Sequence, residues 1–228
     1  MARVDPDVPI ETSIQTLAEF VAAGKIGGIG LSEVSAATIR RAHAVHPIAA
    51  VENELSLTST TSIGNGVLET CRERRWSLPL IIEEKKSCAF ADKCVILSVG
   101  ITFVAYSPLS RGLMTGDIRK LSDIPENDFR RMLPRFGEDV FDENFKLVEA
   151  VERIAKDRGV SVAQVALAWV RYQGALPIPS MSSVERVVEN TEVVELSVEE
   201  LRAIEEILSK FEIKGKRYPV FMENLLEQ

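Results

Sequence analysis

The chain has 228 residues, a formal net charge of -7 and three cysteines. The acidic balance argues against general nucleic-acid binding, which depends on clustered basic side chains. No apolar run reaches the roughly 18 residues that a membrane span needs. A sparse, odd number of cysteines fits a reducing compartment, and the first residues carry no secretory signal. We therefore expect a cytoplasmic protein that binds neither nucleic acid nor membrane, and nothing in the sequence indicates an oligomeric state.

The residues that could bind a metal are few and badly spaced for it. Cys88 and Cys94 are too far apart for a zinc knuckle, and no histidine lies near them. The only histidines, His43 and His46, are better explained as the end of a helix and its exit loop. We expect no metal.

The first part of the chain alternates helices with short apolar stretches. Residues 9–23 predict a helix, because apolar side chains recur on one face and Gly24 follows as a closing residue. Residues 25–32 predict a short buried strand. Ser35 is then placed to cap a helix over residues 36–45.

The alternation continues past the middle of the chain. Residues 47–52 predict a second strand, and residues 65–73 resemble the start of a helix. Residues 101–106, "ITFVAY", give the clearest strand pattern, because six apolar or β-prone residues stand together.

The last third predicts helices around one more strand. Ser161 and Gln164 have the spacing of a capping box, as do Ser197 and Glu200, so each pair marks a helix start. The other predicted elements are helices over 144–159 and 182–191 and a strand over 175–180.

This order predicts an α/β fold with a parallel sheet and helices outside it. The strand candidates are nearly all apolar, which is typical of strands buried on both faces. Only four strands are visible, whereas a complete eight-stranded barrel usually takes about 250 residues. We therefore expect a (β/α)8 TIM barrel that is incomplete, with about strands 5–8, in one domain over residues 1–228.

Several separate motifs resemble the aldo/keto reductase family, in the family's order and near its spacing. They are the stretch over residues 2–52, "NGVLETCRE", "FVAYSPLSRGLMTG", "VAQVALAWV" and "IPSMSSVERVVENT". The opening "ARVDP" and Glu52 look most like the fungal pyridoxal reductase branch. The resemblance implies reduction of a small-molecule aldehyde, such as pyridoxal to pyridoxine, with NADPH.

The resemblance gives "YSPLSRG" a role as the loop around the cofactor. It implies that Tyr106 lies near the nicotinamide ring, and that Ser107, Leu109, Ser110 and Gly112 lie along the pyrophosphate. Backbone N–H groups must approach anionic oxygens closely there, and glycine permits this. Without the resemblance, an ordinary loop after a strand is the better interpretation.

The second cofactor element is the stretch from Ile178. The resemblance implies that Ser182 and Arg186 hold the adenosine 2′-phosphate, with Glu189 and Asn190 at the adenine. The planar fork of an arginine suits a phosphate, which favours NADP(H) over NAD(H). Taken alone, Arg186 would be read as a solvated helix residue.

The nicotinamide carboxamide is assigned to the ends of the first two strands. The resemblance places Ser32 and Glu52 against it, with Glu33 at the same rim. A carboxylate directed into a barrel needs a donor to offset its desolvation, and the amide of nicotinamide could supply one.

The family's proton donor is a tyrosine tuned by a lysine and an aspartate, and its pattern is not found here. Tyr106, Tyr172 and Tyr218 sit in other motifs, so no catalytic residue is assigned. Residues 74–100 form an atypical insertion relative to the family. A surface insertion is the plainer interpretation; our preferred hypothesis is translated non-coding sequence in a truncated gene model.

Three interpretations therefore stay open. The chain is an NADPH-dependent reductase seen only through its cofactor half, a non-catalytic NADP-binding remnant, or an unstable fragment. A physical argument supports the third interpretation: half a barrel exposes sheet edges and apolar surface, which invite aggregation.

Overall fold

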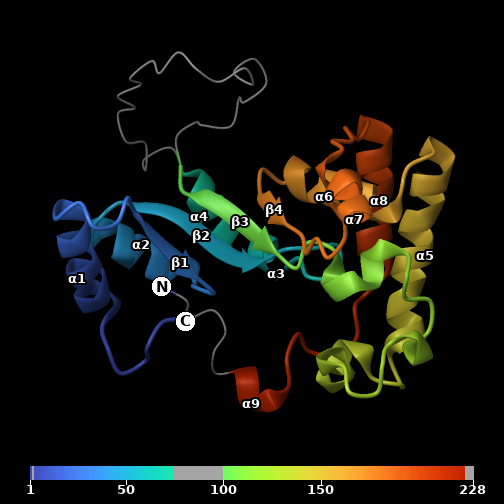
Figure 1. Cartoon of the computed structure of the whole chain (residues 1–228), viewed down its shortest axis with the longest axis horizontal. Coiled ribbons are helices and arrows are strands. Elements are labelled where there is room, and N and C mark those ends of the chain that lie inside the picture. The colour runs from blue at the N-terminus through green and yellow to red at the C-terminus, as the bar shows by residue number, and fades with distance from the viewer. Residues whose placement is uncertain (2, 74–99, 224–228) are drawn as a thin grey trace.

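The computed structural model describes residues 1, 3–73 and 100–223. At its centre lies a four-stranded parallel sheet in which each strand pairs with the next in chain order (Figure 1). The strands are β1 (Ile29–Ser32), β2 (Ile48–Glu54), β3 (Thr102–Tyr106) and β4 (Leu176–Ile178). This confirms the α/β class and the four predicted strands, while the incomplete barrel stays a prediction.

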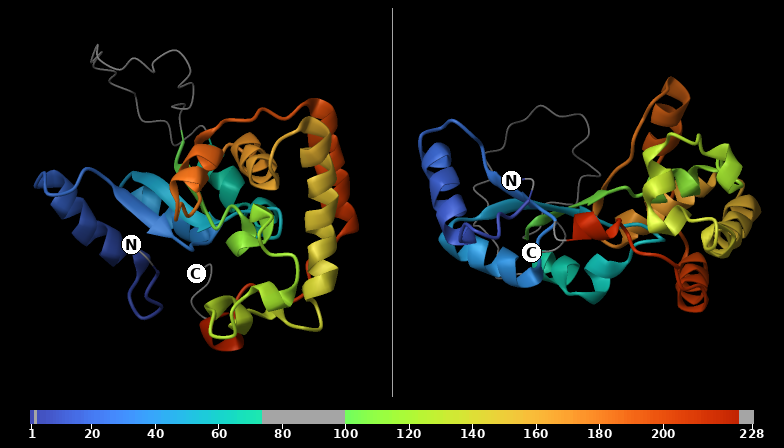
Figure 2. Two further views of the ribbon diagram at one scale, coloured as in Figure 1. Left: turned by 45° about the vertical axis from the view of Figure 1, so that its right-hand side comes forward. Right: turned by 90° about the horizontal axis from the view of Figure 1, so that it is seen from below.

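One helix precedes the sheet, and others follow each strand. They are α1 (Ile10–Ala22), α2 (Ala36–Val45), α3 (Thr61–Gly64), α4 (Val67–Arg72), α5 (Phe141–Arg158), α6 (Val162–Tyr172), α7 (Val184–Thr191), α8 (Val198–Lys210) and α9 (Val220–Glu223). Helices α2 and α4 lie on one side of the sheet, and α5, α6 and α8 pack together beyond β4 (Figures 1 and 2). None of the described helices is long and apolar enough to cross a membrane.

The predicted helix caps are confirmed. The Ser35 side chain accepts a hydrogen bond from the Thr38 N–H at 3.2 Å. Both capping boxes form: the side chains of Ser161 and Ser197 accept from the third residue of α6 and α8. Local sequence sets these boundaries, because each cap satisfies N–H groups that the helix leaves without partners.

The strands are only partly buried, so the expectation of burial on both faces is wrong. In β1 and β3 buried residues alternate with more accessible ones, whereas β2 is interrupted by accessible residues and ends in two buried ones, Asn53 and Glu54. In β4, Leu176 and Ile178 are 56% and 44% exposed. Apolar composition misled here, since small and β-branched residues suit a sheet face that no helix covers.

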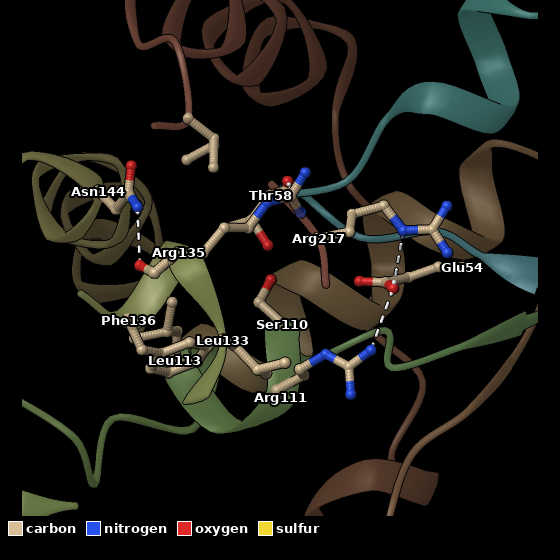
Figure 3. A pocket seen from close by; sticks show the side chains of 11 residues that line it. Glu54, Thr58, Ser110, Arg111, Leu113, Leu133, Arg135, Phe136, Asn144 and Arg217 are labelled. Atoms are coloured by element: carbon tan, nitrogen blue, oxygen red, sulfur yellow. Dashed lines mark hydrogen bonds and ion pairs between the residues drawn. The ribbon is translucent and has the colours of Figure 1, made fainter. Parts of the chain in front are cut away.

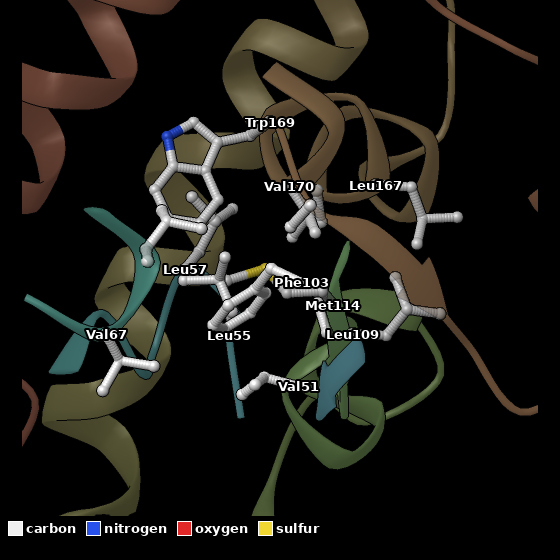
Figure 4. Packing of buried hydrophobic residues seen from close by; sticks show 14 of the residues in the cluster. Val51, Leu55, Leu57, Val67, Phe103, Leu109, Met114, Leu167, Trp169 and Val170 are labelled. Carbon is white, nitrogen blue, oxygen red and sulfur yellow. The ribbon is translucent and has the colours of Figure 1, made fainter. Parts of the chain in front are cut away.

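The core lies between the sheet and the helices that follow it. Side chains from β2, β3, the loop after β3 and α6 meet there, including Leu55, Phe103, Met114 and Trp169 (Figure 4). Trp169 is 2% exposed and is the largest of the fully buried side chains in the described ranges. The core therefore joins the sheet to α6 and to the helices α5 and α8 that pack with it.

The predicted insertion at 74–100 lies, apart from Gly100, outside the described residues. The chain on its two sides meets directly: the Ile101 N–H donates to the Cys71 carbonyl at 3.0 Å. A Cβ on Gly100 would lie 2.5 Å from that same carbonyl oxygen. Glycine is needed at this close approach, and a short turn could join the two sides.

Deleting residues 74–99 is therefore expected to leave a chain that folds with an undiminished free energy of unfolding. The deletion shortens the connection between two described ends that are already adjacent, and loop-closure entropy favours the shorter connection. Urea unfolding followed by circular dichroism would measure this. A deletion chain without a cooperative transition would contradict the expectation.

Candidate functional site

The carboxyl ends of β3 and β4 open into one crevice of about 860 Å³. In parallel sheets, ligands bind at this end of the strands, where the following loops converge. The residues lining it from the end of β3 and the loop after it include Tyr106, Ser107, Leu109 and Gly112. Those from the loop after β4 and from α7 include Ser180, Ser182 and Arg186. Six of the eleven predicted cofactor residues thus share one crevice.

The loop after β3 has an unusual backbone. Ser107, Ser110 and Arg111 adopt left-handed φ angles of 51°, 53° and 56°, followed by Gly112 at 98°. Such angles cost free energy in residues with a side chain and gather at binding sites. The strained backbone therefore favours a loop shaped for a ligand, as the predicted phosphate loop would be.

The backbone N–H groups of two predicted residues already have partners. The Ser110 N–H donates to the Ser107 carbonyl and the Gly112 N–H to the Leu109 carbonyl, both at 2.9 Å. These bonds shape the loop, so Ser110 and Gly112 serve its conformation through their N–H groups.

Ser110 is the predicted loop residue that lies outside the crevice. It lines a neighbouring cavity of about 10 Å³, with Glu54, Arg111, Arg135 and Arg217 (Figure 3). Its hydroxyl is buried and has no hydrogen-bond partner among the described groups. That volume is about the size of one water molecule, which could satisfy the hydroxyl.

The start of α7 supplies the cationic end of the crevice. Ser183 caps the helix by accepting from the Arg186 N–H at 3.3 Å. The Arg186 guanidinium donates to Glu189 at 2.7 Å and also to Asp117, whose side chain is 69% exposed. A ligand phosphate would therefore compete with an exposed carboxylate for this arginine.

Glu189 and Asn190 do not line the crevice. Glu189 contacts it through the ion pair with Arg186. Asn190 is 2% exposed and donates to the Ser180 carbonyl at 3.5 Å, while its Oδ1 is buried with no partner in the described part of the chain. Asn190 thus supports the turn at Ser180 from beneath.

Ser32 and Glu52 are register neighbours on β1 and β2, and Glu52 pairs in turn with Val104 of β3. Both are partly accessible. Neither lines the crevice. The structure thus brings Ser32 and Glu52 to each other, but it does not bring them to the crevice.

Glu33 is fully buried in a charged cluster that sequence reasoning missed. It accepts from Tyr106 Oη at 2.7 Å and from Arg217 Nη2 at 2.9 Å. Glu54, at the end of β2, accepts from Arg217 Nε at 3.1 Å and Arg111 Nη2 at 3.3 Å (Figure 3). One signal was available: buried carboxylates at strand ends require cations, and "KGKRYP" near the end of the sequence supplies one.

The cluster changes the chemistry of Tyr106. Burial, and then the carboxylates of Glu54 and Glu33, raise the pKa of its hydroxyl above the usual value. Burial by itself would lower the pKa of the Arg217 guanidinium. The carboxylates of Glu54 and Glu33 outweigh the effect of burial, so the pKa is raised. Tyr106 therefore stays protonated and is a poor proton donor.

Known proteins resemble this chain in sequence and in fold. The model of the Aldo/keto reductase family matches residues 1–84 and 78–209. The chain is 36% identical over 221 residues to Aldo-keto reductase str7 of Strobilurus tenacellus, covering 94% of this chain and 58% of that protein. It therefore spans less than two thirds of that relative's length.

Solved structures share the fold. The glycerol dehydrogenase AKR11B4 from Gluconobacter oxydans superposes with a TM-score of 0.74 at 23% identity, over 93% of this chain and 58% of that one. The aldose reductase from Schistosoma japonicum gives 0.56 at 20% identity, over 95% and 55%. Since the family model covers well over half of the sequence, the chain belongs to the aldo/keto reductase family.

Proposed function

We propose that this chain holds NADP(H) in the crevice between the loops after β3 and β4, as the cofactor-binding part of an aldehyde reductase. When bound, the cofactor would supply a hydride to the substrate carbonyl. The substrate is a small aldehyde, and the resemblance to pyridoxal reductases favours pyridoxal.

The observation that carries the proposal is the meeting of Tyr106, Ser107 and Arg186 in one crevice. Its volume of about 860 Å³ lies within the range of about 300–1,000 Å³ that is usual for ligand pockets. Tyr106 would provide an aromatic face for the nicotinamide ring. The left-handed loop that begins at Ser107 would lie along the pyrophosphate, and the Arg186 guanidinium of α7 would bind the 2′-phosphate.

Arg186 would distinguish NADPH from NADH. Its guanidinium can bind the 2′-phosphate with two parallel hydrogen bonds, once Asp117 gives up its contact. The ion pair with Glu189 would keep the side chain in the crevice during this exchange.

The proposed reaction needs a proton donor, and we do not assign it to this chain. The raised pKa of Tyr106 and its engagement by Glu33 leave that tyrosine as a platform for the nicotinamide ring. Binding without turnover is the alternative function, a nucleotide-binding remnant, and the same assay separates the two.

The test is to titrate the purified chain with NADPH and NADH. Replacing Arg186 with alanine should weaken NADPH binding about 10- to 100-fold, because charge-assisted hydrogen bonds to the 2′-phosphate are lost. NADH binding should change little. Isothermal titration calorimetry measures both affinities.

Arg202→Ala, which removes an exposed arginine from α8, is the matched control and should alter neither affinity. Equal losses for NADPH and NADH in Arg186→Ala would contradict the assignment of Arg186. Pyridoxal reduction by the chain alone would favour the reductase over the remnant and would show that the donor is present.

A further inference from the structure

The charged cluster joins the C-terminal part of the chain to the strand ends that form the crevice. Arg217 is only 8% exposed, and its Nη2 lies 2.9 Å from each oxygen of Glu33. Its Nε donates to Glu54 at 3.1 Å. One guanidinium thus bridges the ends of β1 and β2.

The same guanidinium reaches the tyrosine of the crevice. Arg217 Nη2 also donates to Tyr106 Oη at 3.0 Å, and Tyr106 Oη lies 3.3 Å from Tyr218 Oη. With Glu33 as acceptor, the Tyr106 hydroxyl has three partners, two of them from residues 217–218. The tyrosine that lines the crevice is thereby fixed by its polar end.

The phosphate loop is held by the same segment. Arg111 Nη2 donates to Tyr218 Oη at 2.6 Å, and its guanidinium carbon lies 4.8 Å from the centre of the Tyr218 ring. Because Arg111 has a left-handed backbone angle, this anchorage helps to hold an otherwise unfavourable conformation.

Other contacts fix the path of the segment before Arg217. Asn144 of α5 donates to the Lys214 carbonyl at 3.0 Å and accepts from the Lys214 N–H at 2.7 Å. Arg135 donates to the Gly215 carbonyl at 3.3 Å. Arg217 therefore enters the cluster from a rigid support.

We infer that residues 214–218 form a clamp in which Arg217 is a positioning residue: it holds Tyr106 in place for the nicotinamide ring and so sets the affinity for that half of the cofactor. The inference rests on the proposed NADP(H) function. It assigns Arg217 no contact with the cofactor and no step in the reaction.

The test compares NADPH with 2′,5′-ADP, which keeps the adenosine 2′-phosphate but has no nicotinamide. In Arg217→Met we expect the dissociation constant for NADPH to rise about tenfold, with that for 2′,5′-ADP unchanged. Arg217→Lys keeps the charge and should recover part of the loss. The emission of bound NADPH should shift toward that of the free cofactor in Arg217→Met alone.

Two further variants keep the result interpretable. Arg158→Met removes a guanidinium that pairs with Glu200 far from the crevice, and should change neither affinity. Should Arg217→Met not fold, Tyr218→Phe removes only one hydroxyl, and we expect an NADPH-selective loss of about fivefold.

The outcomes separate the two ideas. Equal weakening of NADPH and 2′,5′-ADP, or an unchanged affinity ratio in Tyr218→Phe, would overturn the clamp while leaving NADP(H) binding in place. An unaltered chain that binds neither ligand would refute the proposed function, and the clamp with it.

Discussion

Replacing Trp169 with alanine is expected to lower the free energy of unfolding by about 3–5 kcal/mol. The indole is 2% exposed and belongs to the buried cluster that also contains Leu57 and Met114 (Figure 4). Its removal loses apolar burial and leaves a cavity that the surrounding strands and helices can fill only in part. Urea unfolding followed by circular dichroism measures the loss.

The same helix offers the control for that experiment. Tyr172 lies three residues further along α6 and is 57% exposed, so Tyr172→Ala removes an aromatic ring without opening a cavity. We expect its effect to stay within about 0.5 kcal/mol. Similar losses of unfolding free energy for the two variants would contradict the central place of Trp169 in the core.

Gly215→Ala is the second change with a large expected effect, a loss of about 2–4 kcal/mol. Gly215 has a φ of 82°, and a Cβ there would lie 2.5 Å from the Pro134 carbonyl oxygen and 2.9 Å from the Arg135 nitrogen. These are backbone atoms, so the segment that carries Arg217 must move away. NADPH affinity should fall along with stability.

Gly24→Ala separates strain from collision. Gly24 has a similar φ of 67°, but nothing lies within 4 Å of the position that a Cβ would take there. It should lose only about 1 kcal/mol, the cost of a left-handed alanine. If Gly215→Ala proved as mild as Gly24→Ala, the close approach of Gly215 to Pro134 would not be what fixes the position of residues 214–218.

Local sequence was sufficient for the existence of the four strands and for the starts of the capped helices, but α3, α9 and the short helical turns after β3 were not predicted. Ser35, Ser161 and Ser197 begin helices because a side-chain oxygen and a backbone N–H a few residues away satisfy each other. Gly159 ends α5 with a φ of 73°, a conformation that glycine adopts without a steric penalty. Such signals act within one helical turn and can be read directly.

Contacts between distant segments could not be read in that way. Arg217 and Glu33 are 184 residues apart, and no spacing rule links them. Glu33 was predicted at the cofactor rim, yet it is fully buried and paired. Ser110 belongs to a recognisable motif, but the left-handed turn directs its hydroxyl to the small cavity beside Arg135. In each case packing in three dimensions decided the environment.

The left-handed residues of the loop after β3 also bear on how this protein could acquire heat resistance. Ser107, Ser110 and Arg111 each store conformational strain that glycine would relieve. Glycine at Arg111 would also remove the guanidinium that binds Glu54 and Tyr218. A rise in melting temperature at this loop would thus come at the expense of the proposed nucleotide binding, so thermal adaptation is easier elsewhere in the molecule.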